Sequence, residues 1–181
     1  MEQLAFLDMP HVTMEVSIVP APLSSSGADQ VEFLMSANPG EPPRSIARIA
    51  SGGELSRVML AIKSVLADAD DIDTLVFDEI DTGVSGEIAD RMADIMQEMG
   101  EQERQVISIT HLPQIAARGR AHYKVYKRDN DMETNSHIRR LTDEERVEEI
   151  AHMLSGATLT EAALENAKSL LNSKLELSNS K

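Results

Sequence analysis

Residues 74–111 read TLVFDEIDTGVSGEIADRMADIMQEMGEQERQVISITH, and this stretch decides the fold. It begins with a short apolar strand at residues 74–77 and ends with a second one at residues 106–109. Between the two strands, apolar residues recur at three- and four-residue spacing, which predicts a helix around residues 88–99. Strand, helix and strand of these lengths indicate parallel pairing with a right-handed crossover. The segment therefore predicts an α/β fold.

On the N-terminal side of this segment, a helix is predicted from Ser51, because apolar residues again recur at helical spacing up to Leu66. Further upstream, apolar and polar residues alternate over residues 11–19, and residues 31–36 form a second apolar run. These two runs predict strands of an antiparallel edge unit. Residues 20–30 between them are predicted to be a turn-rich loop.

On the C-terminal side, residues 122–127 and 135–141 predict a hairpin around residues 128–133. Two helices follow, one from Thr142 to near Gly156 and one from near Thr158, each with a glutamate placed for an N-terminal capping box. The predicted architecture is a mostly parallel sheet flanked by helices, with antiparallel strands at its margins. Residues 1–177 are predicted to form one lobe, and residues 178–181 a frayed tail.

Composition narrows the functional classes. The chain has 181 residues, of which 41% are hydrophobic and 27% charged, and it has no cysteine. This excludes disulfides and thiolate metal sites, and fits a reducing cytoplasm. No apolar run approaches the roughly 20 residues that a membrane span needs. The net charge of −14 means that a DNA contact must be a local patch or lie on other parts of a larger protein.

A first candidate site lies at the predicted start of the helix at Ser51, in the sequence Ser51-Gly52-Gly53-Glu54-Leu55-Ser56-Arg57. Ser51 and Glu54 are spaced as a capping box, so one interpretation is simply a well-capped helix. The same geometry offers exposed backbone N–H groups at the positive end of a helix dipole, which is a ready anion site. Two glycines also remove side chains where a phosphate would approach. Both interpretations stand on these residues alone.

The carboxylates Asp78 and Glu79 follow the first strand directly. This places them at the carboxyl edge of a parallel sheet, where α/β proteins bind ligands. Because successive side chains on a strand point opposite ways, the two acids are expected to divide roles. One would hold Mg²⁺, usually through water, and the other would deprotonate an attacking water. The alternative is a solvated pair of acids that ends a strand.

His111 ends the second strand and is expected at the same sheet edge as Asp78 and Glu79. A lone histidine is usually structural. A histidine beside a phosphate site, however, can donate a hydrogen bond to a terminal phosphate.

Taken together, the three segments resemble the ABC-ATPase superfamily, with a signature motif, a Walker B strand ending in Asp-Glu, and a switch histidine, in that order. In finer detail the chain is similar to the RecN family of SMC-like DNA-repair ATPases from about Leu4 to Leu171. The motifs that carry the resemblance are residues 51–57, 77–86 and 110–116, and residues 146–156 add to it.

This resemblance implies specific roles. Asp78 would be the Walker B magnesium ligand, Glu79 the general base, and His111 the residue that reads the γ-phosphate of ATP. Ser51 and Gly53, within the signature motif formed with Gly52 and Glu54, would contact ATP bound to the opposite protomer of a head-to-head homodimer. Ser85 occupies the D-loop position where many SMC-like proteins carry Asp, so its role at the dimer seam is less well defined.

A phosphate-binding loop of the form Gly-x-x-x-x-Gly-Lys-Ser/Thr is missing from the sequence, which contains no Gly-Lys dipeptide. In the RecN family that loop lies on an N-terminal lobe beyond a coiled coil. We therefore expect this chain to be the C-terminal lobe of a longer ATPase, inactive alone. The complete protein would hydrolyse ATP with Mg²⁺ during DNA double-strand-break repair and recombination, in the cytoplasm at the nucleoid. The alternatives are a lobe of another ABC-type ATPase, such as a transporter subunit, or a non-catalytic interaction module.

A basic cluster falls in the predicted hairpin and comprises Lys124, Lys127, Arg128, Arg139 and Arg140. The favoured interpretation is that these residues face outward and keep a sheet edge soluble. The alternative is a small DNA-facing patch.

Overall fold

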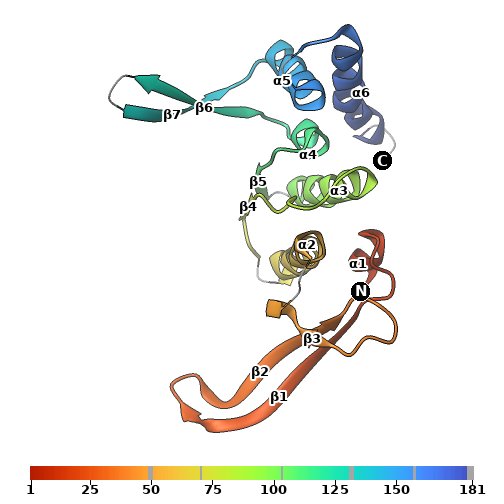
Figure 1. The fold of residues 1–181 in the computed structure, drawn as a ribbon, viewed down its shortest axis with the longest axis vertical. Coiled ribbons are helices and arrows are strands. Elements are labelled where there is room, and N and C mark those ends of the chain that lie inside the picture. The colour runs from red at the N-terminus through yellow and green to blue at the C-terminus, as the bar shows by residue number, and fades with distance from the viewer. Residues whose placement is uncertain (49–50, 70, 103, 131–132, 157, 179–181) are drawn as a thin grey trace.

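The computed structural model describes the whole chain except residues 49–50, 70, 103, 131–132, 157 and 179–181. The elements are arranged along one long axis, with the N-terminal helix in the middle beside the helix of residues 52–69 (Figure 1). The antiparallel hairpin of residues 13–36 lies at one end and the last two helices lie at the other. A parallel strand pair with its helices lies between them, so the motif-bearing segments occupy the middle of the molecule.

The first sheet is antiparallel and contains β1 (Thr13–Ser24), β2 (Gly27–Ser36) and the short β3 (Arg44–Ser45). A short 3₁₀ helix, η1 (Ile46–Arg48), follows. The antiparallel edge unit is confirmed, but the predicted loop at residues 20–30 is wrong. β1 continues to Ser24, with a register shift between Pro20 and Ser24, and β2 already starts at Gly27. Proline lacks the N–H of a sheet ladder, and is tolerated at edges and bulges of this kind.

The central unit contains α2 (Gly52–Ala69), β4 (Thr74–Asp78), α3 (Glu87–Glu101) and β5 (Gln105–Ile109). β4 and β5 pair in parallel from Thr74 opposite Gln105 to Asp78 opposite Ile109. This confirms the α/β fold and the parallel strand pairing predicted from residues 74–111. Within the described strands, this is the one parallel pair; the remaining pairings are antiparallel.

The main hydrophobic core lies on one face of the β4–β5 pair. Leu75 and Phe77 point into this core, together with Val58 and Leu60 of α2 and Met92 of α3. Strand alternation sends the neighbouring side chains to the opposite face. There Val76, Ile107 and Ile109 are 60%, 42% and 50% exposed. One face of the strand pair is thus packed and the other is open.

Two short helices were not predicted. α1 (Glu2–Phe6) packs Leu4 into the main core, and α4 (Pro113–Arg118) follows β5. α4 contributes Ile115 to the main core and Ala117 to a second one. Proline at the first helical position of α4 suits the helix start, because its missing N–H would be unpaired there in any case.

The C-terminal part contains the hairpin of β6 (Tyr123–Asn130) and β7 (Glu133–Arg140), followed by α5 (Asp143–Ser155) and α6 (Glu161–Ser178). The predicted capping box of α5 is confirmed. Thr142 Oγ1 accepts from the Glu145 N–H, and the Glu145 carboxylate accepts from the Thr142 N–H. α6 begins later than predicted, and Thr160 rather than Thr158 accepts the N–H of Ala163. The second core joins α4, α5 and α6.

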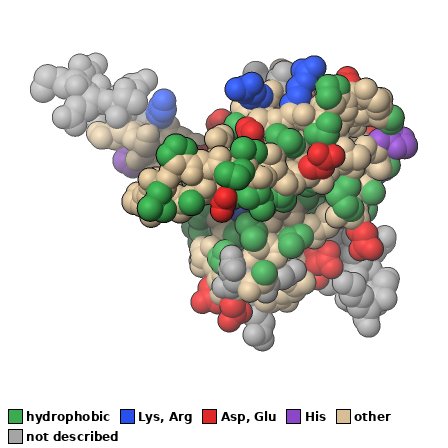
Figure 2. All heavy atoms as spheres, turned by 90° about the horizontal axis from the view of Figure 1, so that it is seen from below, with side chains coloured by type: hydrophobic (Ala, Val, Ile, Leu, Met, Phe, Trp, Pro, Cys, Tyr) green, Lys and Arg blue, Asp and Glu red, His purple; other side chains and the backbone are tan. Residues whose placement is uncertain are grey.

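The β1–β2 hairpin carries apolar side chains on an open face. Val16 pairs with Phe33 and Ile18 with Val31, and each of the four is more than half exposed. Figure 2 looks at the molecule from this end and shows hydrophobic side chains gathered over the hairpin. In the described part of the chain, no helix has the length and apolar character needed to cross a membrane.

Candidate functional site

The signature segment starts α2 as predicted. The hydroxyl of Ser51 accepts a hydrogen bond from the Glu54 N–H at 3.4 Å, which is one of the two bonds of a capping box. Ser51 and Gly52 are exposed, whereas Gly53 is buried. The start of the helix is therefore open to solvent at the two residues that precede the buried glycine.

The reason that Gly53 is buried is a close backbone contact with the loop that follows β4. A Cβ atom on Gly53 would lie only 2.5 Å from the carbonyl oxygen of Gly83. The Ser56 hydroxyl donates to the carbonyl of Thr82 at 3.4 Å in the same region. Gly83 itself has φ +75°, a backbone conformation that favours glycine. The signature segment and the loop after Asp78 and Glu79 are thus one packed unit, although about 30 positions separate them in the sequence.

Asp78 is the last residue of β4, and its side chain is exposed. Glu79 is also exposed, but it has already left the strand: its φ is +48°, and its N–H donates to the carbonyl of Ile109 at 3.0 Å. The predicted placement at the carboxyl edge of a parallel pair is confirmed. The strand-alternation argument for opposite orientations does not apply, because Glu79 lies in a turn rather than in the strand.

His111 follows β5 at the same edge, so the structure brings it to the strand ends that carry Asp78 and Glu79. Its side chain is 63% exposed. The preceding Thr110 donates its hydroxyl hydrogen to Asp81, and its oxygen accepts the N–H of Leu112 at 2.9 Å. The backbone that carries His111 is therefore tied to the loop after β4.

The sequence reasoning missed Asp81, which is fully buried and links these two loops. Its Oδ2 accepts from Thr110, and its Oδ1 lies 3.7 Å from Nδ1 of His111. The signal for Asp81 was weak, because in sequence it is one more acid beside an acidic pair. The predicted D-loop residue Ser85 is exposed, next to the buried Val84.

The carboxylate oxygens of this region suit a magnesium ion that water and phosphate oxygens also bind. The described residues contain no group of three or more His, Cys, Asp or Glu side chains that would enclose a metal ion. Mg²⁺ commonly binds through one or two carboxylates, with water and phosphate oxygens completing its octahedron. An exposed carboxylate such as Asp78 therefore fits Mg²⁺ brought by a nucleotide rather than an ion held by protein alone.

The basic cluster of the hairpin is partly neutralised by acids of α5. Lys124 pairs with Glu149, and Arg139 pairs with Glu145 at 2.6 Å. The backbone hydrogen bond from Thr142 and the ion pair with Arg139 lower the pKa of Glu145. The side chain of Arg128 lies outside the described residues. Two of the five cations therefore bind α5, which favours a structural role for them over a DNA contact.

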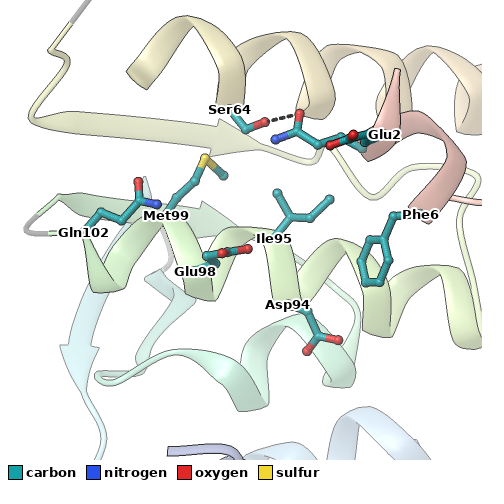
Figure 3. A pocket seen from close by; sticks show the side chains of 9 residues that line it. Glu2, Phe6, Ser64, Asp94, Ile95, Glu98, Met99 and Gln102 are labelled. Carbon is teal, nitrogen blue, oxygen red and sulfur yellow. Dashed lines mark hydrogen bonds between the residues drawn. The ribbon is translucent and has the colours of Figure 1, made fainter. Parts of the chain in front are cut away.

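A hollow lies away from the three motifs, among α1, α2 and α3. It has a volume of about 340 Å³ and is lined by Phe6, Ile95 and Met99 together with acidic and amide side chains. Figure 3 shows the buried Ser64 among the lining side chains, and its hydroxyl donates to Gln3 at 2.6 Å. Burial raises the pKa of Asp94, another lining residue, and the ion pair with Arg118 acts in the opposite direction. The hollow contains none of the predicted site residues.

Known proteins with similar sequences are DNA repair proteins. The chain is 41% identical over 176 residues to RecN of Halalkalibacterium halodurans, a match that covers 94% of this chain and 31% of that protein. RecN of Treponema pallidum is 50% identical over 145 residues, and the match covers 80% of this chain and 25% of that protein. RecN of Deinococcus radiodurans is 49% identical over 166 residues, and the match covers 91% of this chain and 29% of that protein. No protein-family model matches the sequence.

Known structures with a similar fold are SMC heads. A structure described under ATP-driven dimerization and DNA-stimulated activation of SMC ATPases matches with a TM-score of 0.59 and 22% identity, over 87% of this chain and 89% of that chain. An Smc head domain with a coiled coil and joint, derived from Pyrococcus yayanosii, matches with a TM-score of 0.64 and 21% identity. That match covers 85% of this chain and 28% of the other. At these identities, the likeness establishes the fold.

The sequence matches to RecN proteins and the structural matches to SMC heads are consistent with each other. The chain spans about a quarter to a third of the length of the curated relatives it matches. The signature segment begins α2, and Asp78, Glu79 and His111 lie at one edge of the β4–β5 pair, within the fold of an SMC head. On this basis the chain belongs to the RecN family.

Proposed function

We propose that this chain supplies part of an ATP-hydrolysing site in a RecN-type protein of the relatives' length. The observation that carries the proposal is the parallel register of β4 and β5, which brings Asp78, Glu79 and His111 to one edge. A phosphate-binding loop would come from sequence outside these residues, because the chain contains no Gly-Lys dipeptide.

Each residue has a task that suits its position. The exposed carboxylate of Asp78 would bind Mg²⁺ through oxygen, and the metal would neutralise charge on the phosphates. Glu79, in a turn held by the carbonyl of Ile109, would orient and deprotonate the attacking water. His111 would contact the terminal phosphate.

The signature segment would act across a dimer. Ser51 is exposed at the start of α2, where backbone N–H groups and the helix dipole favour an anion. It would bind the γ-phosphate of ATP held by a second head, and Gly52, Gly53 and Glu54 would form the surface that this phosphate approaches. Ser85 would lie at the dimer interface. Two sites would then form between two copies. The ATP-driven dimerization described for one of the similar SMC ATPases supports this arrangement.

The biological setting follows from the relatives. Three RecN proteins named for DNA repair align with most of this chain, so we propose that ATP hydrolysis serves double-strand-break repair and recombination in the cytoplasm, at the nucleoid. With a net charge of −14, this lobe would repel phosphate over most of its surface. DNA would therefore bind mainly to other parts of the protein.

The test uses a hybrid protein, in which this chain replaces the matching segment of the Halalkalibacterium halodurans relative. Glu79→Gln should lower ATP turnover by about 10²–10⁴-fold, since that is the usual contribution of a general base. ATP binding should persist and stabilise a dimer that size-exclusion chromatography resolves. The control is Glu15→Gln, an exposed glutamate of β1. Turnover of the Glu79→Gln protein within about threefold of the parent, far short of the general-base factor, would contradict the assignment.

A further inference from the structure

Asp81 is a buried carboxylate with one satisfied and one unsatisfied oxygen. The residue is fully buried, and its Oδ2 accepts the hydroxyl hydrogen of Thr110. Its Oδ1 has no hydrogen-bond partner among the described residues. Because a buried carboxylate oxygen without a partner is destabilising, a donor close to Oδ1 would be strongly preferred.

A donor is available in the ring of His111, whose Nδ1 lies 3.7 Å from Oδ1. That separation is longer than a hydrogen bond. The ring is 63% exposed, so a small rotation toward Oδ1 meets little packing. Active-site hydrogen bonds are often long in structures without ligand and shorten when the site assembles.

The direction of the Thr110 hydroxyl supports this pairing. Its oxygen accepts the N–H of Leu112 at 2.9 Å, so its own hydrogen is free to point to Asp81. The carboxylate is thereby held in a fixed orientation, with Oδ2 committed to Thr110 and Oδ1 turned toward His111. The residues on both sides of His111 are thus anchored by two hydrogen bonds that share the Thr110 hydroxyl.

We propose that Asp81 is a positioning residue for His111: its Oδ1 accepts the Nδ1–H of the ring and leaves Nε2 to face the ligand. A carboxylate that accepts from one imidazole nitrogen fixes both the tautomer and the orientation of the ring. Nε2 then acts as an acceptor toward water in the neutral ring, or as a donor to phosphate in the doubly protonated ring. The role toward phosphate rests on the proposed function, but the pairing itself does not.

The experiment measures which ring nitrogen carries the proton. Uniformly ¹⁵N-labelled chain is studied without nucleotide, by long-range ¹H–¹⁵N correlation at about pH 8.5, roughly two units above the ordinary pKa of a histidine side chain in model peptides. The His111 signals are identified by their loss in His111→Gln. In the parent chain His111 should be mainly the Nδ1–H tautomer. In Asp81→Asn it should return to the Nε2–H form that free imidazole side chains favour, whereas Asp73→Asn, an exposed acid before β4, should leave it unchanged.

The parent spectrum decides the proposal even if Asp81→Asn fails to fold, which its amide spectrum would reveal. A parent chain with His111 mainly in the Nε2–H form would overturn the pairing, as would an Nδ1–H form that survives in folded Asp81→Asn. The proposed ATPase is tested separately by turnover of the hybrid protein. An inactive hybrid with the Nδ1–H tautomer would therefore count against the enzyme, and an active hybrid with the Nε2–H tautomer would count against Asp81.

Discussion

Gly53 and Gly83 approach so closely that a Cβ atom on Gly53 would lie 2.5 Å from the Gly83 carbonyl oxygen and 3.2 Å from its carbonyl carbon. Both opposing atoms belong to the backbone, so no side chain can rotate away to make room. A methyl group at this position must push the loop after β4 away from α2.

Gly53→Ala should therefore destabilise the chain by roughly 1–3 kcal/mol, the usual range for overpacking a tight site. The matched control is Gly52→Ala. There a new Cβ would meet its nearest atom, the carbonyl oxygen of Thr82, at an ordinary 3.9 Å. Gly52→Ala should stabilise the chain by about 0.4–1 kcal/mol, since alanine restricts the unfolded state. Urea unfolding followed by circular dichroism measures both, and equal stability of the two variants would refute the contact.

A second prediction concerns nucleotide affinity. The 181-residue chain should bind Mg·ATP only weakly and should not hydrolyse it, because a phosphate-binding loop makes most contacts to the α- and β-phosphates. Isothermal titration calorimetry and a phosphate-release assay provide the measurement. A micromolar Kd with steady turnover would show that the chain has a complete site of its own.

A third prediction concerns where Ser51 acts. In the hybrid protein, Ser51→Arg would place a bulky cation at the exposed start of α2 and block engagement of the two heads. A heterodimer of one Ser51→Arg protomer and one Glu79→Gln protomer, purified through two different tags, should recover some ATP hydrolysis. If Ser51 serves the opposite protomer's site, both defects fall on one site and the other site stays intact.

The reciprocal heterodimer controls for sites that act only together. It pairs a parent protomer with a protomer that carries both changes, which should spoil both sites if Ser51 acts across the dimer. Hydrolysis by this second heterodimer, with none by the first, would place Ser51 in the site of its own protomer.

A fourth prediction concerns pH. Burial lowers the pKa of His122, and the charge of Arg146 acts in the same direction. The unfolded chain, with an ordinary histidine pKa of about 6.5, then binds this proton more readily than the folded chain. The contribution of His122 to stability is therefore present above about pH 6.5 and is lost as the pH falls below it.

Urea unfolding at several pH values between about 5 and 8, a range that brackets the ordinary histidine pKa, measures this effect. His122→Gln should reduce the loss of stability on acidification, whereas His11→Gln, which changes an exposed histidine, should keep the parent profile. Identical profiles for the parent and His122→Gln would exclude the proposed linkage.

The long elements were predictable because their periodicity spans several turns or strand residues. The strand–helix–strand order of residues 74–111 led directly to the parallel pair and to the common edge of Asp78, Glu79 and His111. α1 and α4 were missed because five and six residues are too few for a helical period to emerge. The prolines of β1 suggested a loop, although at a hairpin open to solvent their missing N–H groups are tolerated.

Asp81 shows why part of the site was not predictable. Its importance comes from burial and from contacts with Thr110 and His111, and these depend on how two loops meet at the ends of β4 and β5. Local sequence does not encode the distance between such loops. The close approach of Gly53 to Gly83 has the same origin.

α4 contributes to two cores, with Ile115 in one and Ala117 in the other. This division affects how cooperatively the chain unfolds. The buried members of the second core are mainly alanines, namely Ala117, Ala151, Ala163 and Ala167, with Ile150. Small side chains remove little apolar surface from water. We therefore expect the α5–α6 pair to open at a lower free energy than the body around β4 and β5, and its amides to lose protection first in hydrogen exchange. Since α4 begins at Pro113, close to His111, each such opening frees the side of α4 that packs on the second core.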